Sequence, residues 1–507
     1  MMEKPDIFYI TTPIYYVNDK PHIGHVYTTL AADVLARWHR LRGGDVFFLT
    51  GTDEHGAKVA ASAAANRKTP QQFADENSER FRDAFKKLGI VGTDFIRTTE
   101  LRHVKAVRAF MEKLQNATTP KGNPALYEAD YRGLYCIACE RFYTEKELAD
   151  GRCPIHKRPV EPVKERNVFF RLSDYLDDVR NAVESDAVRV LPEERKREAL
   201  GLIEQGIEDF SVSREKVKWG IPFPGKEGQT IYVWVEALQN YLSALGYPDA
   251  KPFQKFWPAS VQLIGKDILK FHAIYWPALL MAAGLPLPKT LFVHGFFTIN
   301  GDKMSKSQGN VIDPVALTKE YGIDGVRYLL LTQFPFGQDG DVQQGRFRDK
   351  YNTDLANGIG NFASRVLAMV HKYSGGEVPV AEGISPDVQT KIDETRVTVH
   401  DALDAFAFER ALAAIQALIT DGDTRIDRAK PWQLATSSPE QLPQILYDLL
   451  AVLVAITVLL APFLPETTAK LRTTLGLGEA GGDDIPTLPP GRSLAPIEPL
   501  FPRLAKQ

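Results

Sequence analysis

The sequence predicts an α/β fold in which a parallel-sheet domain is split by an insertion and followed by a bundle of α-helices. Strand-like segments that are apolar throughout occur near the start of the chain and again after residue 260, as in parallel sheets covered on both faces. The three cysteines all lie between these two regions. After residue 345, apolar residues recur at helical spacing. A chain of 507 residues has room for several domains of roughly 100–200 residues each.

The first half of the sheet domain is predicted as strand, helix and strand. Residues 6–10 form the first apolar strand, and 12–20 form a loop. Pro21 suits the first position of a helix, where its missing N–H costs nothing. Apolar residues then recur at helical spacing over 22–41, and 46–49 form a second buried strand.

The same pattern returns late in the chain. Residues 261–265 and 291–295 are strand-like, and 267–284 are predicted to be helical between them. The predicted units are 1–115 and 225–300 (the two halves of the sheet domain), 116–224 (the insertion), 301–350 (a loop and connecting segment), 351–475 (the α-helical domain) and 476–507 (an irregular tail).

The helical region and the overall composition indicate no membrane partner. Helices are predicted within 350–373, 386–420, 424–436 and 440–473. The longest apolar run, 449–464, contains a proline and is shorter than the roughly 20 residues that cross a bilayer, so we expect a buried helix. No signal peptide precedes the first strand, which favours a cytoplasmic protein, although an organellar protein with a trimmed transit peptide fits as well. The net charge of −3 means that any nucleic acid must be bound by local basic patches.

The first motif that carries chemistry is His22-Ile23-Gly24-His25, at a predicted helix start after a strand. The two histidines are three positions apart and therefore share one helix face. Glycine allows a flat ring to approach the backbone, and a helix N-terminus attracts phosphates. Alone, the tetrapeptide fits a pair of core histidines equally well.

The second motif is Lys303-Met304-Ser305-Lys306-Ser307, after a Gly-Asp turn and a strand. Two lysines and two hydroxyls on a loop can clamp a triphosphate and neutralise charge as it moves. Alone, this segment fits a solvated lysine-rich loop.

Together and in this order, the two motifs resemble those of the class I aminoacyl-tRNA synthetases, and the chain resembles the methionyl-tRNA synthetase family along nearly its whole length. The resemblance implies a Rossmann-type catalytic domain that activates L-methionine with ATP and Mg²⁺. It also implies that methionyl-adenylate and pyrophosphate are formed, and that methionine is then transferred to the terminal ribose of initiator and elongator tRNA(Met) in protein biosynthesis. Such a reaction needs no protein nucleophile, so catalysis rests on orientation and charge stabilisation.

The resemblance also implies roles for the nucleotide-binding residues. His22 and His25 would hold the phosphates, and Gly24 would make room for adenine. Lys303 and Lys306 would stabilise the departing pyrophosphate. The family's ribose contacts fall on Gly265 and Asp267, although Asp267 could instead cap a helix.

A methionine pocket should be aromatic and apolar, with one carboxylate for the amine. Asp53, after the second strand, would bind the ammonium. The other positions that match the family's pocket are Pro13, Ile14, Tyr16, Trp234, Ala237, Leu238, Tyr241 and His294. Each of them, taken singly, also fits ordinary core packing. Some relatives carry proline where this chain has Leu238.

The cysteines form the pattern Cys136-x₂-Cys139-x₁₃-Cys153-x₂-His156. Two ligand pairs at this spacing suit one tetrahedral, structural Zn²⁺ with no open position. His156 could instead be a surface residue. A zinc site would fold an insertion that has little core of its own.

Three residues of the helical region match the family's anticodon-binding positions. Asn361 and Arg365 lie one turn apart and could hydrogen-bond base edges, whereas Trp432 could stack on an unpaired base. A solvated helix face and a hydrophobic helix start are the alternative interpretations.

Other functions were weighed against this one. Class I enzymes for leucine, isoleucine and valine carry a larger editing insertion, and the cysteine enzyme places zinc ligands in its core. A small-molecule nucleotidyltransferase would need neither the cysteine insertion nor the helical region. A catalytically dead tRNA-binding paralogue would not need the intact histidines and lysines. The chain ends without a recognisable dimerisation domain, so we expect a monomer.

Overall fold

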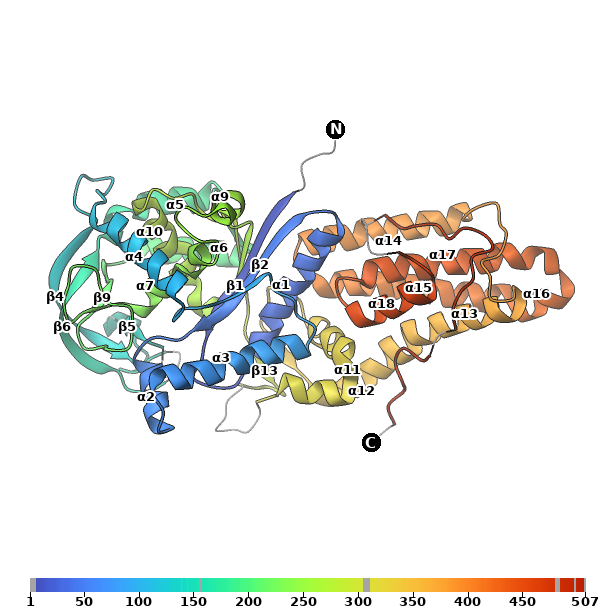
Figure 1. Ribbon diagram of the computed structural model, residues 1–507, viewed down its shortest axis with the longest axis horizontal. Coiled ribbons are helices and arrows are strands. Elements are labelled where there is room, and N and C mark those ends of the chain that lie inside the picture. Colours follow the sequence, from blue (N-terminus) through green and yellow to red (C-terminus); the bar gives the residue numbers. More distant parts are fainter. Residues whose placement is uncertain are drawn as a thin grey trace.

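The computed structural model describes residues 6–137, 139–143, 145–154, 157–303, 311–478, 484–496 and 498–505. The α/β part forms one half of an elongated molecule and the helical bundle forms the other (Figure 1). The predicted parallel-sheet domain with an insertion and a helical C-terminal region is confirmed.

Six parallel strands form the central sheet, in the order β3-β2-β1-β11-β12-β7. Their bounds are β1 Ile7–Tyr16, β2 Asp45–Asp53, β3 Asp94–Arg97, β7 Arg189–Leu191, β11 Val261–Gly265 and β12 Thr290–His294. β1 pairs with β2 on one side and with β11 on the other, which brings the two halves of the split domain together. β7 comes from the stretch 116–224 that was assigned to the insertion, so part of that stretch completes the edge of the sheet.

The first strand is longer than the sequence predicts. β1 continues to Tyr16 through a change of register between Thr11 and Ile14, so the prediction of a loop over 12–20 is wrong for its first half. The irregularity contains Pro13, which has no N–H to donate to a neighbouring strand. As a result, Tyr16 lies opposite Asp53 at the carboxyl ends of β1 and β2.

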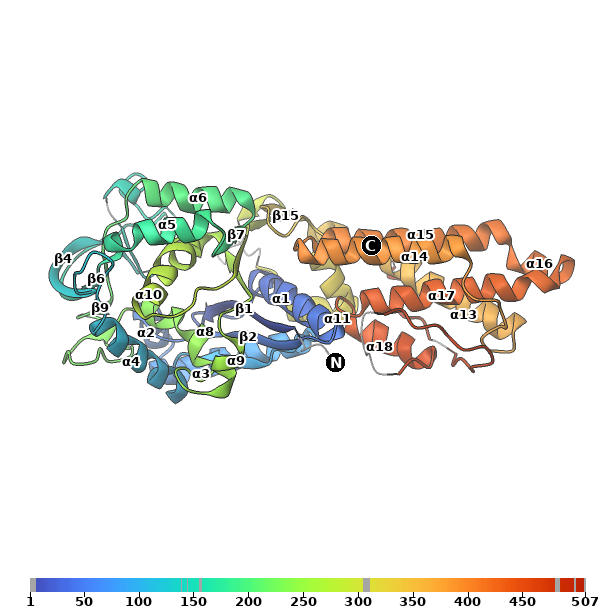
Figure 2. The ribbon, with the colours of Figure 1, turned by 90° about the horizontal axis from the view of Figure 1, so that it is seen from above.

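Helices cover the sheet on both sides. Those of the first half are α1 Ile23–Leu41, α2 Ala57–Ala65, α3 Pro70–Lys87 and α4 Leu101–Gln115. α1 begins at Ile23 with His22 as its N-cap, so Pro21 precedes the helix rather than opening it. Those that follow are α5 Leu176–Glu184, α6 Glu193–Glu204, α7 Val233–Leu238, α8 Asn240–Ser243, α9 Lys251–Phe256 and α10 Trp276–Ala282, with a 3₁₀ turn at Lys266–Ile268 and a π-helical turn at Phe271–Tyr275. Figure 2 shows α5 and α6 on the side of the molecule opposite to α3 and α4.

The cysteine-containing segment forms a second, antiparallel sheet at the far end of the α/β part (Figure 1). Its strands are β4 Leu126–Cys136, β5 Arg141–Tyr143, β6 Glu161–Phe170 and β8 Phe210–Ser211, and a separate hairpin is formed by β9 Ser213–Arg214 and β10 Thr230–Ile231. Cys136, Tyr143 and Cys153 form a small buried cluster of their own, apart from the main cores.

A short three-stranded sheet and two helices connect the α/β part to the bundle. They are β13 Phe297–Ile299, β14 Asp302–Lys303, β15 Gly340–Val342, α11 Pro314–Leu331 and α12 Phe347–Lys350. The guanidinium of Arg327 in α11 is fully buried and donates to Asp33 of α1 at 2.8 Å and to the carbonyls of Pro462 and Phe463 at 3.0 and 2.7 Å. One side chain thus joins the helix that carries the histidine motif to the bundle.

The bundle follows a π-helical stretch at Tyr351–Gly360. Its helices are α13 Asn361–Tyr373, α14 Pro386–Asp404, α15 Phe408–Ala429, α16 Pro431–Ser437, α17 Leu442–Leu460 and α18 Pro465–Thr474. The single helix predicted over 386–420 is two helices, because Phe406 adopts a left-handed conformation and stacks on Phe292 of the sheet at 4.4 Å. One helix among the described residues, Pro439–Leu460, is apolar and long enough to cross a membrane, but 78% of its most apolar window is buried inside the protein.

Candidate functional site

The histidine motif lies at the N-terminus of α1, as predicted. Nδ1 of His22 accepts a hydrogen bond from the amide of Gly24 at 3.1 Å, and Nδ1 of His25 accepts one from the amide of His22 at 3.2 Å. The two rings stack with their centroids 3.7 Å apart. Because both Nδ1 atoms are acceptors, a neutral ring carries its proton on Nε2, which leaves Nε2–H free to donate to an anion.

Burial keeps both imidazoles neutral. It lowers the pKa of His22 to about 4. It also lowers the pKa of His25 well below its usual range, helped by the charges of His22 and Lys58. At neutral pH the motif therefore offers two fixed N–H donors beside a helix N-terminus, an arrangement that suits phosphate oxygens.

The segment that follows the lysine motif reaches the same helix. Lys303 ends β14, whereas Lys306 lies outside the described residues. After the motif, the carbonyl of Ile312 accepts a hydrogen bond from the amide of Ile23 at 3.4 Å. The segment after the lysine motif is thus bonded to the first residue of α1, next to the histidines.

The carboxyl ends of β11 and β12 lie beside this motif. Gly265 pairs with His294, and Nε2 of His294 lies 2.7 Å from the hydroxyl of Thr28 in α1. Nδ1 of His294 lies 2.9 Å from the carbonyl of Gly295 and therefore carries the proton, so Nε2 accepts from Thr28. Asp267 is exposed within the 3₁₀ turn, whose N-cap is Gly265, so the helix-cap alternative for Asp267 is wrong.

The aromatic residues predicted for the methionine pocket come together. Trp234 of α7 stacks on Phe271 with centroids 4.1 Å apart, and Tyr16 meets Trp234 edge-on at 6.0 Å. Ile14 packs against the same core, and Ala237 and Leu238 are buried on α7.

Two histidines occupy positions that bear on the predicted pocket. His294 was predicted to contact the methionine side chain, and it lies against Thr28 and against Gly265, one of the predicted ribose contacts. The histidine beside Tyr241 is His272, in the π-helical turn, with Nε2 2.8 Å from the tyrosine hydroxyl. Nδ1 of His272 lies 3.1 Å from the carbonyl of Ile268, and burial lowers the pKa of His272 to about 4. The Tyr241 hydroxyl therefore donates to a neutral ring. A π-helical turn has no local sequence pattern that would have marked His272.

Asp53 lies at the carboxyl end of β2 and has an unusual electrostatic environment. Its side chain is buried, and Oδ1 has no hydrogen-bond partner among the described residues. Burial and the nearby charges of Glu236 and Glu140 raise the pKa of Asp53 well above its usual range. A buried carboxylate with an unused acceptor is stabilised by a cation that reaches it, so the site favours an ammonium group.

A buried network that was not predicted supports this region. Both carboxylate oxygens of Glu236 in α7 lie 2.9 Å from histidines, one from His55 and the other from His103. Burial by itself would raise the pKa of Glu236, but the two histidines hold that pKa below its usual range. The network ties α7 to the loop after Asp53 and to α4, so it fixes this wall of the site, and His55 also lines a small cavity there.

The cysteine cluster has the chemistry of a metal site. The sulfur atoms of Cys136, Cys139 and Cys153 all lie within 4.8 Å of one another, and the three cysteines are free thiols. Burial raises the pKa of Cys139, so a cation is needed to hold this sulfur as a thiolate. The predicted fourth ligand, His156, lies outside the described residues. Three clustered cysteines fit a metal that prefers sulfur.

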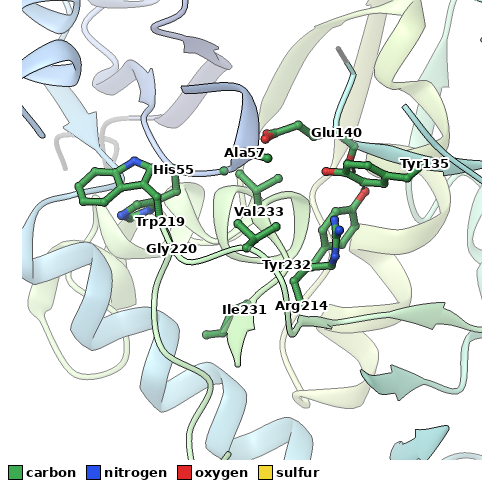
Figure 3. Close-up of a pocket in the computed structure, with 12 residues that line it drawn as sticks. His55, Ala57, Tyr135, Glu140, Arg214, Trp219, Gly220, Ile231, Tyr232 and Val233 are labelled. Carbon is green, nitrogen blue, oxygen red and sulfur yellow. Dashed lines mark hydrogen bonds between the residues drawn. The ribbon is translucent and has the colours of Figure 1, made fainter. Parts of the chain in front are cut away.

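Two backbone carbonyls of the cysteine-containing segment accept hydrogen bonds from residues at the start of α7. The indole N–H of Trp234 donates to the carbonyl of Cys139 at 3.3 Å, and the hydroxyl of Tyr232 donates to the carbonyl of Glu140 at 2.6 Å. The Glu140 carboxylate is fully buried and points towards Ala57 at the start of α2, beside a small cavity (Figure 3). The antiparallel sheet is therefore part of the site's frame.

The three residues assigned to the anticodon lie in the bundle, far along the molecule from the histidine motif. Asn361 begins α13 and is exposed, and the Trp432 side chain is 47% exposed on α16. Arg365 pairs with Asp423 at 2.6 Å and with Asp427 at 2.7 Å, both on α15. These pairs hold the guanidinium in place, so a base edge would have to share it with two carboxylates.

Family models match nearly the whole chain. The model described as "tRNA synthetases class I (M)" matches residues 8–161 and 145–367. The model described as "Anticodon binding domain of methionyl tRNA ligase" matches residues 375–507.

Relatives named methionine–tRNA ligase are similar over almost all of the chain. The Thermotoga maritima protein is 42% identical over 510 residues, which cover 98% of this chain and 80% of the relative. The Clostridium perfringens protein is 45% identical over 94% of this chain and 74% of its own length. The Rickettsia felis protein is 43% identical over 93% of this chain and 92% of its own length.

Solved structures of a methionyl-tRNA synthetase are also similar to this chain. Mycobacterium tuberculosis methionyl-tRNA synthetase in complex with methionyl-adenylate superposes with a TM-score of 0.94 at 38% identity, covering 98% of this chain and all of that one. The apo form of the same enzyme superposes with a TM-score of 0.88 at 35% identity over both full chains.

Proposed function

The chain belongs to the methionyl-tRNA synthetase family, and on this premise we propose how its own residues activate L-methionine and charge tRNA. The reaction is methionine–tRNA ligation. The methionine carboxylate attacks the α-phosphorus of ATP, the bond to the β-phosphate breaks, and pyrophosphate leaves with that electron pair. A terminal ribose hydroxyl of tRNA(Met) then attacks the methionyl carbonyl, which releases AMP.

The observation that carries this proposal is the convergence of three features at the carboxyl edge of one sheet. They are a buried carboxylate with one oxygen that lacks a hydrogen-bond partner among the described residues, an aromatic pocket, and a phosphate-binding helix start. ATP–pyrophosphate exchange tested with all twenty amino acids should proceed with methionine and with no other at comparable rate. Exchange that ran equally well with leucine or isoleucine would refute the specificity.

The residues divide the substrates between them. Asp53 takes the methionine ammonium, while Tyr16, Trp234, Tyr241 and His272 enclose the thioether. The Nε2–H groups of His22 and His25 donate to phosphate oxygens in the transition state, where negative charge builds up. Lys303 and Lys306 stabilise the departing pyrophosphate. His294, bonded to the α1 hydroxyl of Thr28, belongs with Gly265 and Asp267 on the nucleotide side rather than with methionine.

We assign the two sheet halves to catalysis, the helical domain 351–475 to the anticodon, and the cysteine-containing segment to the frame of the pocket. This family uses ATP together with Mg²⁺. When Mg²⁺ is bound to the phosphates, it lowers their negative charge. We further propose that the chain acts as a cytoplasmic monomer on both initiator and elongator tRNA(Met).

We propose that the cysteine cluster holds one structural Zn²⁺. Cys136, Cys139 and Cys153 supply three thiolates, and His156 supplies the fourth ligand. Freshly purified protein that has not been exposed to a chelator should contain about one zinc ion per chain, as measured by elemental analysis. Cys153→Ser should lower that content. A wild-type protein without zinc would refute the site whatever its activity.

The assignment of Trp432 to the anticodon separates the two steps of the reaction. Trp432→Ala should lower kcat/KM for tRNA aminoacylation by about tenfold to a hundredfold, the usual cost of losing one stacked base. Exchange should stay near normal, because Trp432 lies in the bundle. Val397, 55% exposed on α14, offers a matched control, and Val397→Ala should alter neither rate. Equal loss of both activities in Trp432→Ala would point to damaged folding instead.

A further inference from the structure

A lysine at the start of α2, Lys58, lies beside the residues of this site. It lies in the first turn of α2, five positions after Asp53, and is half-buried. Its Nζ lies over the ring of Tyr16, 5.0 Å from the ring centroid. Tyr16 in turn lies opposite Asp53 in the sheet and edge-on to Trp234. The ammonium of Lys58 is therefore held above a wall of the methionine pocket.

This ammonium has no bonded counter-ion in the part of the chain that the structure describes. No described carboxylate oxygen lies within 4.0 Å of Lys58 Nζ, although Glu140, Cys139, Asp53 and Cys136 act on its charge from a distance. A lysine that only balanced the buried Glu140 would be expected to contact its carboxylate. Lys58 instead directs its ammonium over an aromatic face, where it remains available to an anion.

The backbone of Lys58 is fixed by the same acidic residue. Glu140 accepts a hydrogen bond from the amide of Lys58 at 2.8 Å, and Figure 3 shows its carboxylate beside Ala57. Gly56, just before the helix, has a φ of +101°, and a Cβ there would lie 2.4 Å from the Glu140 carboxylate oxygens. The start of α2 is thus closely packed, and the position of Lys58 is set by structure rather than by a mobile loop.

Lys58 is also close enough to the phosphate-binding motif to act on its charge. Its charge contributes to the lowered pKa of His25, which places it within electrostatic reach of that ring. Two neighbouring residues of β1 contact the two parts of the site. Tyr15 packs on His25 with ring centroids 4.9 Å apart, whereas Tyr16, under Lys58, meets Trp234 edge-on. Lys58 is therefore within electrostatic reach of both the ammonium site at Asp53 and the histidines.

An amino acid bound by its ammonium at Asp53 brings a carboxylate into a region that is already negative. Glu140 and Glu236 both lie close enough to Asp53 for their charges to raise its pKa. The substrate carboxylate must nevertheless be held as an anion, because the anion is the nucleophile of the activation step. A cation between Asp53 and the phosphate site would meet this need.

We propose that Lys58 binds the carboxylate of methionine and orients it towards the α-phosphate of ATP. The inference rests on the proposed placement of the methionine ammonium at Asp53. It makes Lys58 a substrate-binding residue that offsets the repulsion between the substrate carboxylate and the acidic residues of the pocket. Nothing in it requires Lys58 to transfer a proton.

Methioninol tests this inference, because it keeps the ammonium and thioether of methionine but carries a hydroxymethyl group in place of the carboxylate. The dissociation constants of both compounds should be measured by calorimetry for wild type, Lys58→Met and Lys58→Arg. In Lys58→Met, methionine should lose at least about tenfold more affinity than methioninol, the scale of one charge-assisted hydrogen bond. Lys58→Arg should restore most of the difference. Lys68→Met, which removes a surface lysine just after α2, should change neither constant.

The outcomes separate this inference from the proposed function. Equal weakening of methionine and methioninol in Lys58→Met, or no change in either constant, would overturn it, because the substrate carboxylate would then play no part in the effect of Lys58. If wild type bound neither compound, the pocket assignment itself would fail, and the role of Lys58 with it. A selective loss for methionine, with thermal stability unchanged, would support it.

Discussion

Asp53→Asn should lower kcat/KM for methionine in ATP–pyrophosphate exchange by about a hundredfold or more. Removing one partner of a buried, hydrogen-bonded charge pair typically costs about 2–5 kcal/mol, because the other charge stays buried and unpaired. The substrate ammonium would be that unpaired charge. Asparagine has the same shape, and Oδ1 of Asp53 makes no hydrogen bond among the described residues, so the fold should tolerate the change. The loss should appear mainly in KM for methionine, with KM for ATP nearly unchanged.

The pH dependence of methionine binding gives an independent check on Asp53. Its raised pKa means that the free enzyme holds a proton on this carboxyl above the usual carboxyl range, whereas binding of the ammonium requires the ionised form. Affinity for methionine should therefore increase as the pH rises through the pKa of the free enzyme, and Asp53→Asn should remove that dependence. Asp45→Asn, at the opposite end of β2, is the matched control and should behave as wild type. A variant Asp53→Asn with wild-type KM would contradict the assignment.

His25→Asn should lower kcat for exchange by about 10²–10³-fold, as the loss of one fixed donor to a developing charge does in other enzymes. The asparagine amide oxygen can still accept the hydrogen bond from the amide of His22, so the start of α1 should persist. What is lost is the Nε2–H that the buried, neutral ring presents. Because the donor acts on the phosphates, KM for methionine should change little.

A histidine at the other end of the same helix provides the control. His39 stacks on Phe8 with centroids 3.5 Å apart, and burial lowers its pKa to about 4, so it shares the burial of the motif but not its position. His39→Asn should leave kcat near wild type. If His25→Asn lost affinity for methionine as strongly as it lost kcat, the assignment of His25 to the phosphates would be wrong.

Local patterns in the sequence were enough to predict much of this protein. Apolar runs predicted the strands at 6–10, 46–49, 261–265 and 291–295, and the helical spacing predicted α1, because each pattern reflects contacts that neighbouring residues make with one surface. The spacing of the cysteines predicted a cluster, and the structure brings their three sulfurs together. The motifs around His22 and Lys303, in their order along the chain, were sufficient to indicate the family.

Other features depend on partners that are distant in sequence. β7 is only three residues long, and it becomes a strand because β12 lies beside it. The break at Phe406 depends on stacking against Phe292, more than a hundred positions away. β1 extends past Pro13 because β2 continues alongside it to Asp53.

The chain by itself determined the fold class, the family and most of the residues of the site, since these follow from residue type and spacing. Only the tertiary structure decided what each histidine contacts, because His272 and His294 both occur in apolar surroundings in the sequence. Packing placed His294 against Thr28 of α1 and His272 against Tyr241. It likewise placed Lys58 over Tyr16. A side chain's direction depends on what lies across from it, and residues from distant parts of the chain provide that surface.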